Sequence, residues 1–301
     1  MSAAQADARR GTAPDFLVIG HAVQDLPAEG SSLPWRLGGA VSYASTLARK
    51  FGLRAGVLTS AGPDMDLDTL LPGVEWVLVP SERSTQIRNM YEGGRRRQQM
   101  PQKAAPLTAA HLPVVWRKSP VVLLGPVAGE LDDSLAACFP GSIVGVGAQG
   151  WLRESGPDSA VRPVAPEAWY AAPVLRQATA LFLSDEDVPP NRAPVALQRW
   201  STLVDTVAFT RGYDGADIYH CGLRRHIGAF PAKAVDPTGA GDVFAAAFLI
   251  RLKEGADVWD AARFASCTAS FVVEGEGVAA VPDRAQVEAR LLEHPEIIAR
   301  E

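Results

Sequence analysis

Residues 235–244 read Val-Asp-Pro-Thr-Gly-Ala-Gly-Asp-Val-Phe, and the apolar run Ala-Ala-Ala-Phe-Leu-Ile follows directly at 245–250. Pro237 restricts the residue before it to extended backbone, while Gly239 and Gly241 let the chain bend and approach a ligand closely. Apolar residues then recur at helical spacing. The segment therefore predicts a glycine turn at the amino end of a buried helix.

The amino end of that helix has the groups needed to bind an anion. Unpaired backbone N–H groups and the positive end of the helix dipole suit a phosphoryl group in transfer. Asp242 stands in the same turn, where a carboxylate is well placed to accept the proton of an attacking hydroxyl. The amides of Gly239, Ala240 and Gly241 would stabilise the charge that develops on the phosphate. The alternative is an ordinary loop before a helix, where acidic residues are common.

The rest of the chain predicts one α/β domain. Its 301 residues, 47% of them hydrophobic, are enough to bury a single large core. Short apolar segments alternate with helical patterns such as the one at 40–51. The segments lie at 16–19, 55–59, 121–124, 143–146, 180–183 and 206–210. We therefore predict a doubly wound, mostly parallel sheet flanked by helices, forming a single domain over residues 15–301 after a frayed tail at 1–14.

A small β lid is also expected. Residues 85–91 are typical of an extended arm, Gly93-Gly94 of a tight turn, and residues 95–99 of a return arm, so the hairpin lies near 84–99. A second lid element is expected near 29–36. A lid that closes over a substrate excludes water that would otherwise take the phosphate.

Composition and charge exclude several functions. The net charge of −5 gives no reason to expect nucleic-acid binding, and no apolar run approaches the roughly 20 residues of a membrane span. The first 14 residues lack the apolar core of a secretory signal, so we expect a cytoplasmic protein. Three widely spaced cysteines, Cys138, Cys221 and Cys267, are typical of reduced thiols. The cluster at Arg95–Arg97 is interpreted as a solvated hairpin arm, with a phosphate-binding patch as the alternative.

The string at 236–244 closely resembles the signature of the ribokinase-like (PfkB) carbohydrate kinase family, and weaker family features extend the resemblance from about residue 16 to about residue 282. The resemblance implies that Asp242 is the catalytic base and that Gly239, Ala240 and Gly241 form the anion hole. It implies that Asp236 and Thr238 lie in a loop that holds a monovalent cation such as K⁺. It also implies ATP as donor and Mg²⁺ as cofactor.

For the acceptor, Asp25, Gly38 and Gly39 match the residues that hold sugar or nucleoside hydroxyls in the family. A carboxylate accepts hydroxyl protons and a bare backbone allows close approach. Asp25 alone would be an ordinary turn residue, but the glycine pair at the expected distance favours the ligand role.

For the donor, Thr210, Gly212 and Gly215 resemble the family segment beside the ATP phosphates, although such a turn alone is usually a hairpin. Ser184 and Asp187 occupy the place of the family's Asn-x-x-Glu motif, which arranges magnesium and its waters. Mg²⁺ keeps several waters, so the shorter Asp187 carboxylate can still serve it through water. The alternative is a solvated acidic loop.

Two departures from the family pattern bear on the acceptor. The segment at 65–74 is short, which predicts a trimmed helix. Residues 146–153 replace the strand end of fructokinase-like members and, together with residues 125–130, resemble the inositol kinase branch. On this interpretation Gln149 and Arg153 face the acceptor or the phosphates, whereas the alternative makes them ordinary surface residues.

The sequence thus predicts an ATP- and magnesium-dependent kinase for a hydroxyl of a small polyol, either a cyclitol such as myo-inositol or a sugar. Two other functions remain open. One is a nucleoside kinase of the same fold, in which Trp35 or Tyr91 would stack a base. The other is a catalytically weak sugar- or nucleotide-binding protein. We expect a monomer, or a homodimer formed through the lid, with no nucleic-acid or membrane partner.

Overall fold

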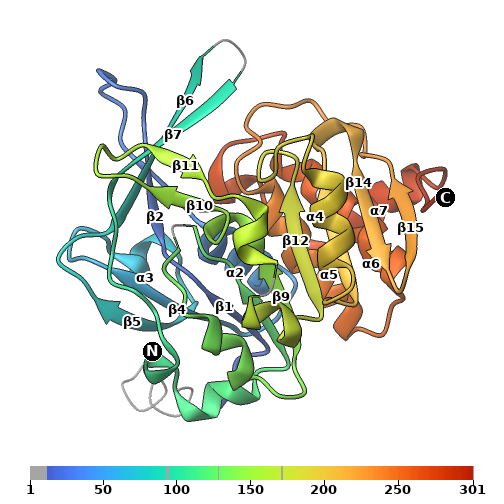
Figure 1. Ribbon diagram of the computed structural model, residues 1–301, viewed down its shortest axis with the longest axis horizontal. Helices are drawn as coiled ribbons and strands as arrows, with labels where there is room; N and C mark the ends of the chain where they lie inside the picture. Colours follow the sequence, from blue (N-terminus) through green and yellow to red (C-terminus); the bar gives the residue numbers. More distant parts are fainter. Residues whose placement is uncertain (1–11, 93–94, 128, 171, 301) are drawn as a thin grey trace.

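The structure is a computed structural model that describes residues 12–92, 95–127, 129–170 and 172–300, with backbone only at 91, 92, 95 and 96 (Figure 1). Within these residues nine strands form one sheet in the order β15-β14-β13-β12-β9-β8-β1-β4-β5. The strands are β1 (Phe16–Ile19), β4 (Ala55–Ala61), β5 (Glu75–Pro80), β8 (Val121–Leu124), β9 (Ile143–Gly147), β12 (Ala180–Ser184), β13 (Thr206–Thr210), β14 (Ala216–His220) and β15 (Leu223–Ile227). All pairings from β5 to β13 are parallel, whereas β14 and β15 continue the sheet antiparallel.

Helices cover both faces of this sheet, as the doubly wound prediction requires (Figure 1). One face carries α2 (Ala40–Lys50), α5 (Ala240–Lys253), α6 (Val258–Val272) and α7 (Arg284–Glu293). The other carries α4 (Ala193–Trp200) and the 3₁₀ turns η1 (Ala109–His111), η2 (Val114–Lys118), η3 (Asp133–Cys138), η4 (Ala148–Gly150), η5 (Pro166–Trp169) and η6 (Pro173–Gln177). The remaining turns are η7 (Gly212–Asp214) and η8 (Gly277–Ala280). The single-turn helix α3 (Leu67–Leu70) stands where a trimmed helix is expected.

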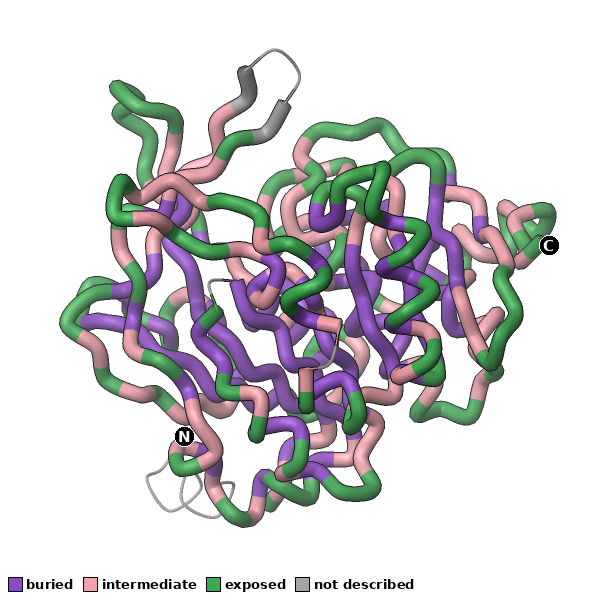
Figure 2. The backbone as a smooth tube through the Cα atoms, viewed as in Figure 1, coloured by how far each residue is buried: buried purple, intermediate pink, exposed green. Residues whose placement is uncertain are grey.

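The core explains why the apolar segments form central strands. The strands from β5 to β14 have one face in each of two hydrophobic clusters, and the buried residues follow the strands in Figure 2. α5 is buried from Val243 to Ile250, because it lies between the sheet and the neighbouring helices α2 and α6. A helix that is apolar on all sides is stable only in such a position. The run after the glycine turn is therefore the central helix of the domain.

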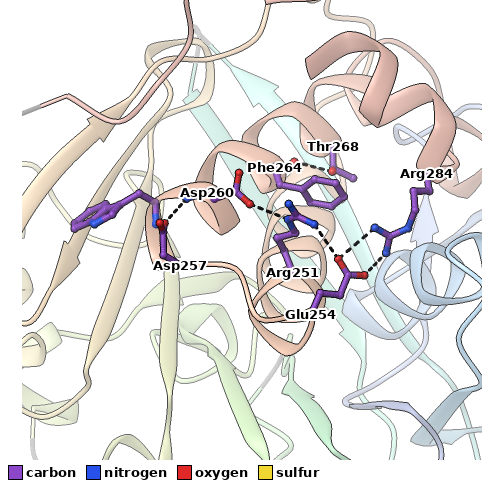
Figure 3. A network of polar contacts seen from close by, with 8 residues as sticks. Arg251, Glu254, Asp257, Asp260, Phe264, Thr268 and Arg284 are labelled. Carbon is purple, nitrogen blue, oxygen red and sulfur yellow. Dashed lines mark hydrogen bonds and ion pairs between the residues drawn. The ribbon is translucent and has the colours of Figure 1, made fainter. Parts of the chain in front are cut away.

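A network of polar contacts fixes the carboxyl end of α5 (Figure 3). Arg251 donates from Nε to Asp260 Oδ2 (2.8 Å) and pairs with Glu254 (3.3 Å), which also binds Arg284 of α7. Asp257 caps α6 by accepting hydrogen bonds from the backbone N–H groups of residues 259 and 260, both at 2.8 Å. These groups are partly exposed, so each pair contributes little on its own. Together they hold the carboxyl end of α5 against α6 and α7.

The lid is a second sheet with the order β3-β2-β6-β7 (Figure 1). Its strands are β2 (Val23–Leu26), β3 (Arg36–Gly38), β6 (Thr85–Glu92) and β7 (Arg95–Gln102). The two arms expected between 84 and 99 are thus β6 and β7, and their turn at Gly93-Gly94 lies outside the described residues. The element expected near 29–36 overlaps only the first residue of the strand, because β3 begins at Arg36.

A hairpin of β10 (Arg153–Ser155) and β11 (Val161–Pro163) extends the lid, and nothing in the sequence predicted it. It contacts β7 through a bridge between Gln99 and Ala160 and through a hydrogen bond from Met100 N to Ser159 O (2.7 Å). The hairpin therefore lies between the lid and the main sheet.

Three smaller findings concern the remaining expectations. Residues 12–14, assigned to a frayed tail, contact the domain: Arg54 donates to Thr12 Oγ1 (2.7 Å), and Gly56 lies against Pro14. The three cysteines are free, with Cys221 exposed and Cys267 buried. Across the described ranges, no helix has both the length and the apolar character needed to cross a membrane.

Candidate functional site

Most of the residues singled out from the sequence lie along one edge of the main sheet. The parallel strands all end at this edge, and loops at the carboxyl ends of parallel strands are where α/β folds bind ligands. From the lid come Asp25 in β2 and Gly38 at the end of β3, and Gly39 follows just before α2. From the main sheet come Gln149 after β9, Ser184 at the end of β12 and Thr210 at the end of β13. Asp242 lies in the first turn of α5.

The glycine turn begins α5 as predicted. Gly239 has a φ of 82°, in the left-handed region that only glycine adopts easily. Asp236 Oδ1 accepts a hydrogen bond from Thr238 N (3.0 Å), which shapes the loop before the turn. Ala240 N donates a long bond of 3.2 Å to Pro237 O. A Cβ on Gly241 would meet no atom within 4 Å, so the first turn of α5 faces open space.

Tyr43 of α2 lies directly behind this turn and was not predicted to belong to the site. A Cβ on Gly239 would lie 2.3 Å from the Tyr43 ring, and Tyr43 is only 2% exposed. Burial raises the pKa of Tyr43, and the charges of Asp25, Asp242 and Asp236 raise it further, while Arg36 lowers it. Tyr43 is therefore neutral and lies near three carboxylates that belong to separate segments. The sequence signal that could have identified Tyr43 as a site residue is its position one helical turn after Gly39.

Asp25 and the glycine pair are packed closely together. A Cβ on Gly38 would lie 2.0 Å from Asp25 Oδ2, and one on Gly39, whose φ is 84°, would lie 2.5 Å from His21 O. Arg36 stands opposite Asp25 in the β2–β3 pair and forms ion pairs with Asp236 (3.5 Å) and Glu276 (3.0 Å). The strand β3, which pairs with the strand that holds Asp25, is thus tied to the loop before the glycine turn.

We expect Gly38→Ala to weaken acceptor binding, because the added methyl group displaces the Asp25 carboxylate. The KM for the acceptor should rise about tenfold to a hundredfold, equivalent to the loss of one or two charge-assisted hydrogen bonds. Steady-state kinetics at saturating donor measures this change. Gly228→Ala is the matched control, since a Cβ at Gly228 meets nothing within 4 Å and its φ is not left-handed. An unchanged KM in Gly38→Ala would remove Gly38 from the acceptor site.

At the other end of the edge, Asp187 is buried with both oxygens engaged. Oδ1 pairs with Arg153 Nη2 (2.8 Å), while Oδ2 accepts from Ser184 N (2.8 Å) and Ser184 Oγ (2.9 Å). The neighbouring Asp185 and Glu186 are exposed. Desolvation, followed by the charge of Glu186, raises the pKa of Asp185. The exposed carboxylates of this turn are therefore Asp185 and Glu186, whereas Asp187 holds the turn together.

This part of the site suits Mg²⁺ better than a metal held only by protein ligands. No three His, Cys, Asp or Glu side chains converge as a metal site within the part of the chain that the structure describes. Mg²⁺ typically takes one or two carboxylates together with waters and substrate phosphates. Exposed Asp185 and Glu186 supply such a donor set.

The turn after β13 contains two glycines with different surroundings, one open to solvent and one packed against the next strands. A Cβ on Gly212 would meet nothing within 4 Å, whereas one on Gly215 would lie 2.1 Å from Ile227 O. Gly215 thus allows the turn to pack against β15. Arg211 binds the fully buried Asp217, which also accepts from Arg224 (3.0 Å) and His226 Nδ1 (3.0 Å). The buried carboxylate fixes the arginine beside Thr210.

The comparisons with known proteins agree with a kinase. Residues 147–284 match the model of the pfkB family carbohydrate kinases. Over 161 residues the chain is 35% identical to an inositol 3-kinase of Oryza sativa subsp. japonica, covering 50% of this chain and 38% of that protein. Over 85 residues it is 44% identical to a nucleoside kinase of Methanothermobacter thermautotrophicus, covering 28% of this chain and 27% of that protein. The chain therefore matches less than half the length of these curated relatives.

A solved structure shares the fold over nearly the whole chain. It is a pyrophosphate-dependent kinase in the ribokinase family, complexed with a pyrophosphate analog and myo-inositol. The TM-score is 0.76 at 20% sequence identity, and the match covers 91% of this chain and 99% of that one. The predicted ribokinase-like α/β fold is confirmed.

Proposed function

Since residues 147–284 match the model of the pfkB family carbohydrate kinases, we propose that this chain transfers a phosphoryl group from ATP to a hydroxyl of a small polyol, either a cyclitol of the myo-inositol type or a sugar. The observation that carries the proposal is the first turn of α5. This turn contains Gly239, whose backbone is left-handed, and the carboxylate of Asp242. Both Asp242 and Asp25 lie near Tyr43. A proton acceptor, an anion site and an acceptor carboxylate thus lie close to one another.

The chemistry assigned to these residues is an in-line displacement. Asp242 accepts the proton of the attacking hydroxyl as that oxygen forms its bond to phosphorus. The backbone N–H groups of Gly239, Ala240 and Gly241 stabilise the charge that develops on the phosphoryl oxygens. Little covalent chemistry is required of the protein, so positioning and charge stabilisation supply most of the rate.

The acceptor is assigned to the end of the site that lies under the lid. Asp25 accepts hydrogen bonds from its hydroxyls, and Gly38 and Gly39 allow its ring to approach the backbone. Gln149, which is half-buried, follows β9 at the same sheet edge. The inositol kinase relative and the neighbour that binds myo-inositol support a cyclitol as the first acceptor to test.

The donor is assigned to the turns after β12 and β13. Thr210, Gly212 and Gly215 border the nucleotide, and Ser184 and Asp187 shape the acidic turn that faces magnesium. Bound Mg²⁺ would neutralise charge on the donor phosphates through water and the carboxylates of this turn. The loop of Asp236 and Thr238 is assigned to a monovalent cation such as K⁺. Pyrophosphate is the alternative donor, because a structural neighbour uses it.

A panel assay tests the function. Wild-type protein with Mg²⁺ is given ATP or pyrophosphate as donor, and an inositol, a ketose, an aldose or a nucleoside as acceptor. We expect ADP release with inositols. Activity on sugars alone would keep the mechanism and discard the cyclitol, and nucleotide binding without any transfer would favour a binding protein.

A nucleoside kinase remains the second candidate, since one relative has that activity. Trp35, which would have to stack a base, is half-buried and packs against the core. The side chain of Tyr91 lies outside the described residues. Transfer to nucleosides in the panel would favour this candidate.

A further inference from the structure

Three side chains from separate segments form a continuous polar chain between the lid and the edge of the main sheet. Arg153 of β10 donates from Nη1 to Gln98 Oε1 of β7 (2.7 Å) and from Nη2 to Asp187 Oδ1 (2.8 Å). One guanidinium group thus binds the lid with one nitrogen and the turn after β12 with the other. We name these three residues the lid clamp.

The clamp is buried, unlike most ion pairs at protein surfaces. The side chains of Arg153 and Asp187 are 11% and 6% exposed. A buried pair is tolerated only when its remaining polar atoms are also satisfied, and Ser184 binds the second oxygen of Asp187. The planar guanidinium fixes both bonds in one geometry. A displacement of either partner is therefore transmitted to the other.

At the lid, the clamp reaches both arms of the hairpin. Gln98 donates from Nε2 to Asn89 Oδ1 of β6 (2.8 Å), directly across the β6–β7 pair. The backbone of β7 also contacts the β10–β11 hairpin through Met100 N and Ser159 O. Arg153 is thus connected, through Gln98, to both arms of the lid hairpin.

At the other end, the clamp reaches the acidic turn to which the donor is assigned. Asp187 closes the turn that begins at Ser184, and Asp185 N donates to Thr210 O (3.1 Å). A Mg²⁺ ion held by this turn would attract Asp187, and donor phosphates would attract Arg153, so both would change the forces on the pair. The clamp is thus a direct side-chain connection between the turn assigned to the donor and the lid.

We propose that Arg153 is a positioning residue that couples donor binding to the ordering of the lid, through Gln98 on one side and Asp187 on the other. The proposal rests on the proposed function for the chemistry of the donor. Because such coupling is reciprocal, a lid held over the acceptor also strengthens donor binding. Arg153 contacts neither reacting atom in this role.

Gln98→Ala tests the clamp without breaking the buried pair, since Arg153 and Asp187 stay together. Gln99→Ala is the matched control, because it removes the same side chain from the adjacent, equally half-buried position on the opposite face of β7.

Hydrogen–deuterium exchange of peptides from β6 and β7 is measured with and without AMP-PNP and Mg²⁺. Wild type and Gln99→Ala should show slower exchange in the lid with the nucleotide. Gln98→Ala should lose about threefold to tenfold of that protection, equivalent to one side-chain hydrogen bond.

Arg153→Lys is the second variant, since it keeps the charge beside Asp187 but lacks the two-pronged guanidinium. It should also lose lid protection, and its nucleotide affinity should fall by no more than the same factor, while the melting temperature without nucleotide stays close to that of the wild type. Equal protection in Gln98→Ala and Gln99→Ala would overturn the coupling, even if wild type phosphorylates a polyol. Imidodiphosphate with Mg²⁺ replaces AMP-PNP if the nucleotide does not bind. If the wild-type protein bound neither donor analogue, both the assigned donor site and the coupling would be overturned. A binding measurement on the wild type alone decides this.

Discussion

Replacement of Asp242 by Asn should abolish measurable turnover while nucleotide binding stays close to that of the wild type. The amide has the same shape but cannot accept the proton of the attacking hydroxyl, and loss of a general base lowers rates by about 10²–10⁴-fold. Asp242 lies in the first turn of a buried, well-packed helix, so the fold should survive. ADP release at saturating ATP and acceptor measures the rate, and calorimetry measures nucleotide affinity.

Asp68→Asn is the control for this change, since Asp68 is an exposed acidic residue in the first turn of another helix, α3. Both variants remove a carboxylate from the first turn of a helix, and in the long helix α5 this costs about 0.3–1 kcal/mol of dipole stabilisation. Only Asp242→Asn should lose turnover. If purified Asp242→Asn retained most of the wild-type activity, Asp242 would not be the base.

Gly239→Ala is the second change with a large expected effect. A Cβ here would lie 2.3 Å from the ring of buried Tyr43, and the φ of 82° is strained for any residue with a side chain. The turn must shift, so its amides no longer point at the phosphoryl group. We expect the rate to fall about 10²–10³-fold, as for loss of an oxyanion-hole donor, and stability to fall by about 1–3 kcal/mol.

Gly241→Ala is the control that separates the effect of backbone strain at Gly239 from the effect of replacing any glycine of this turn with alanine. Gly241 lies in α5 with no atom within 4 Å of its Cβ position, so alanine should raise stability by up to about 1 kcal/mol. Urea unfolding of the two variants gives the comparison. Equal stability of Gly239→Ala and Gly241→Ala would show that Tyr43 does not constrain the turn.

The sequence predicted the features that depend on local pattern. Buried parallel strands are short and apolar, so all six predicted segments are strands of the main sheet. The glycine turn and the central helix follow from the φ preference of glycine and from apolar spacing. The antiparallel strand β15, Leu-Arg-Arg-His-Ile, was not predicted, because it lies at the sheet edge and its interior is polar. The hairpin of β10 and β11 was missed for the same reason, with three residues in each strand.

Long-range pairing is the part that the sequence could not predict. The sequence did not predict that the oxygens of Asp187 bind Arg153 and Ser184, or that its neighbours Asp185 and Glu186 are the exposed carboxylates. The contact of Asp187 with magnesium through water stays a prediction. The partner arginine is far away in the chain and becomes adjacent only because β9 and β12 are neighbours. Tyr43 meets Gly239 for a similar reason, since α2 and α5 pack side by side. Spacing alone does not contain such contacts.

The most direct test of the account is phosphorus NMR of wild-type protein with ATP, Mg²⁺ and myo-inositol, repeated with a sugar. The account predicts a new phosphomonoester signal that grows in step with ADP and is absent from Asp242→Asn. Release of ADP with inorganic phosphate as the only other product, with either acceptor, would contradict transfer to a polyol hydroxyl.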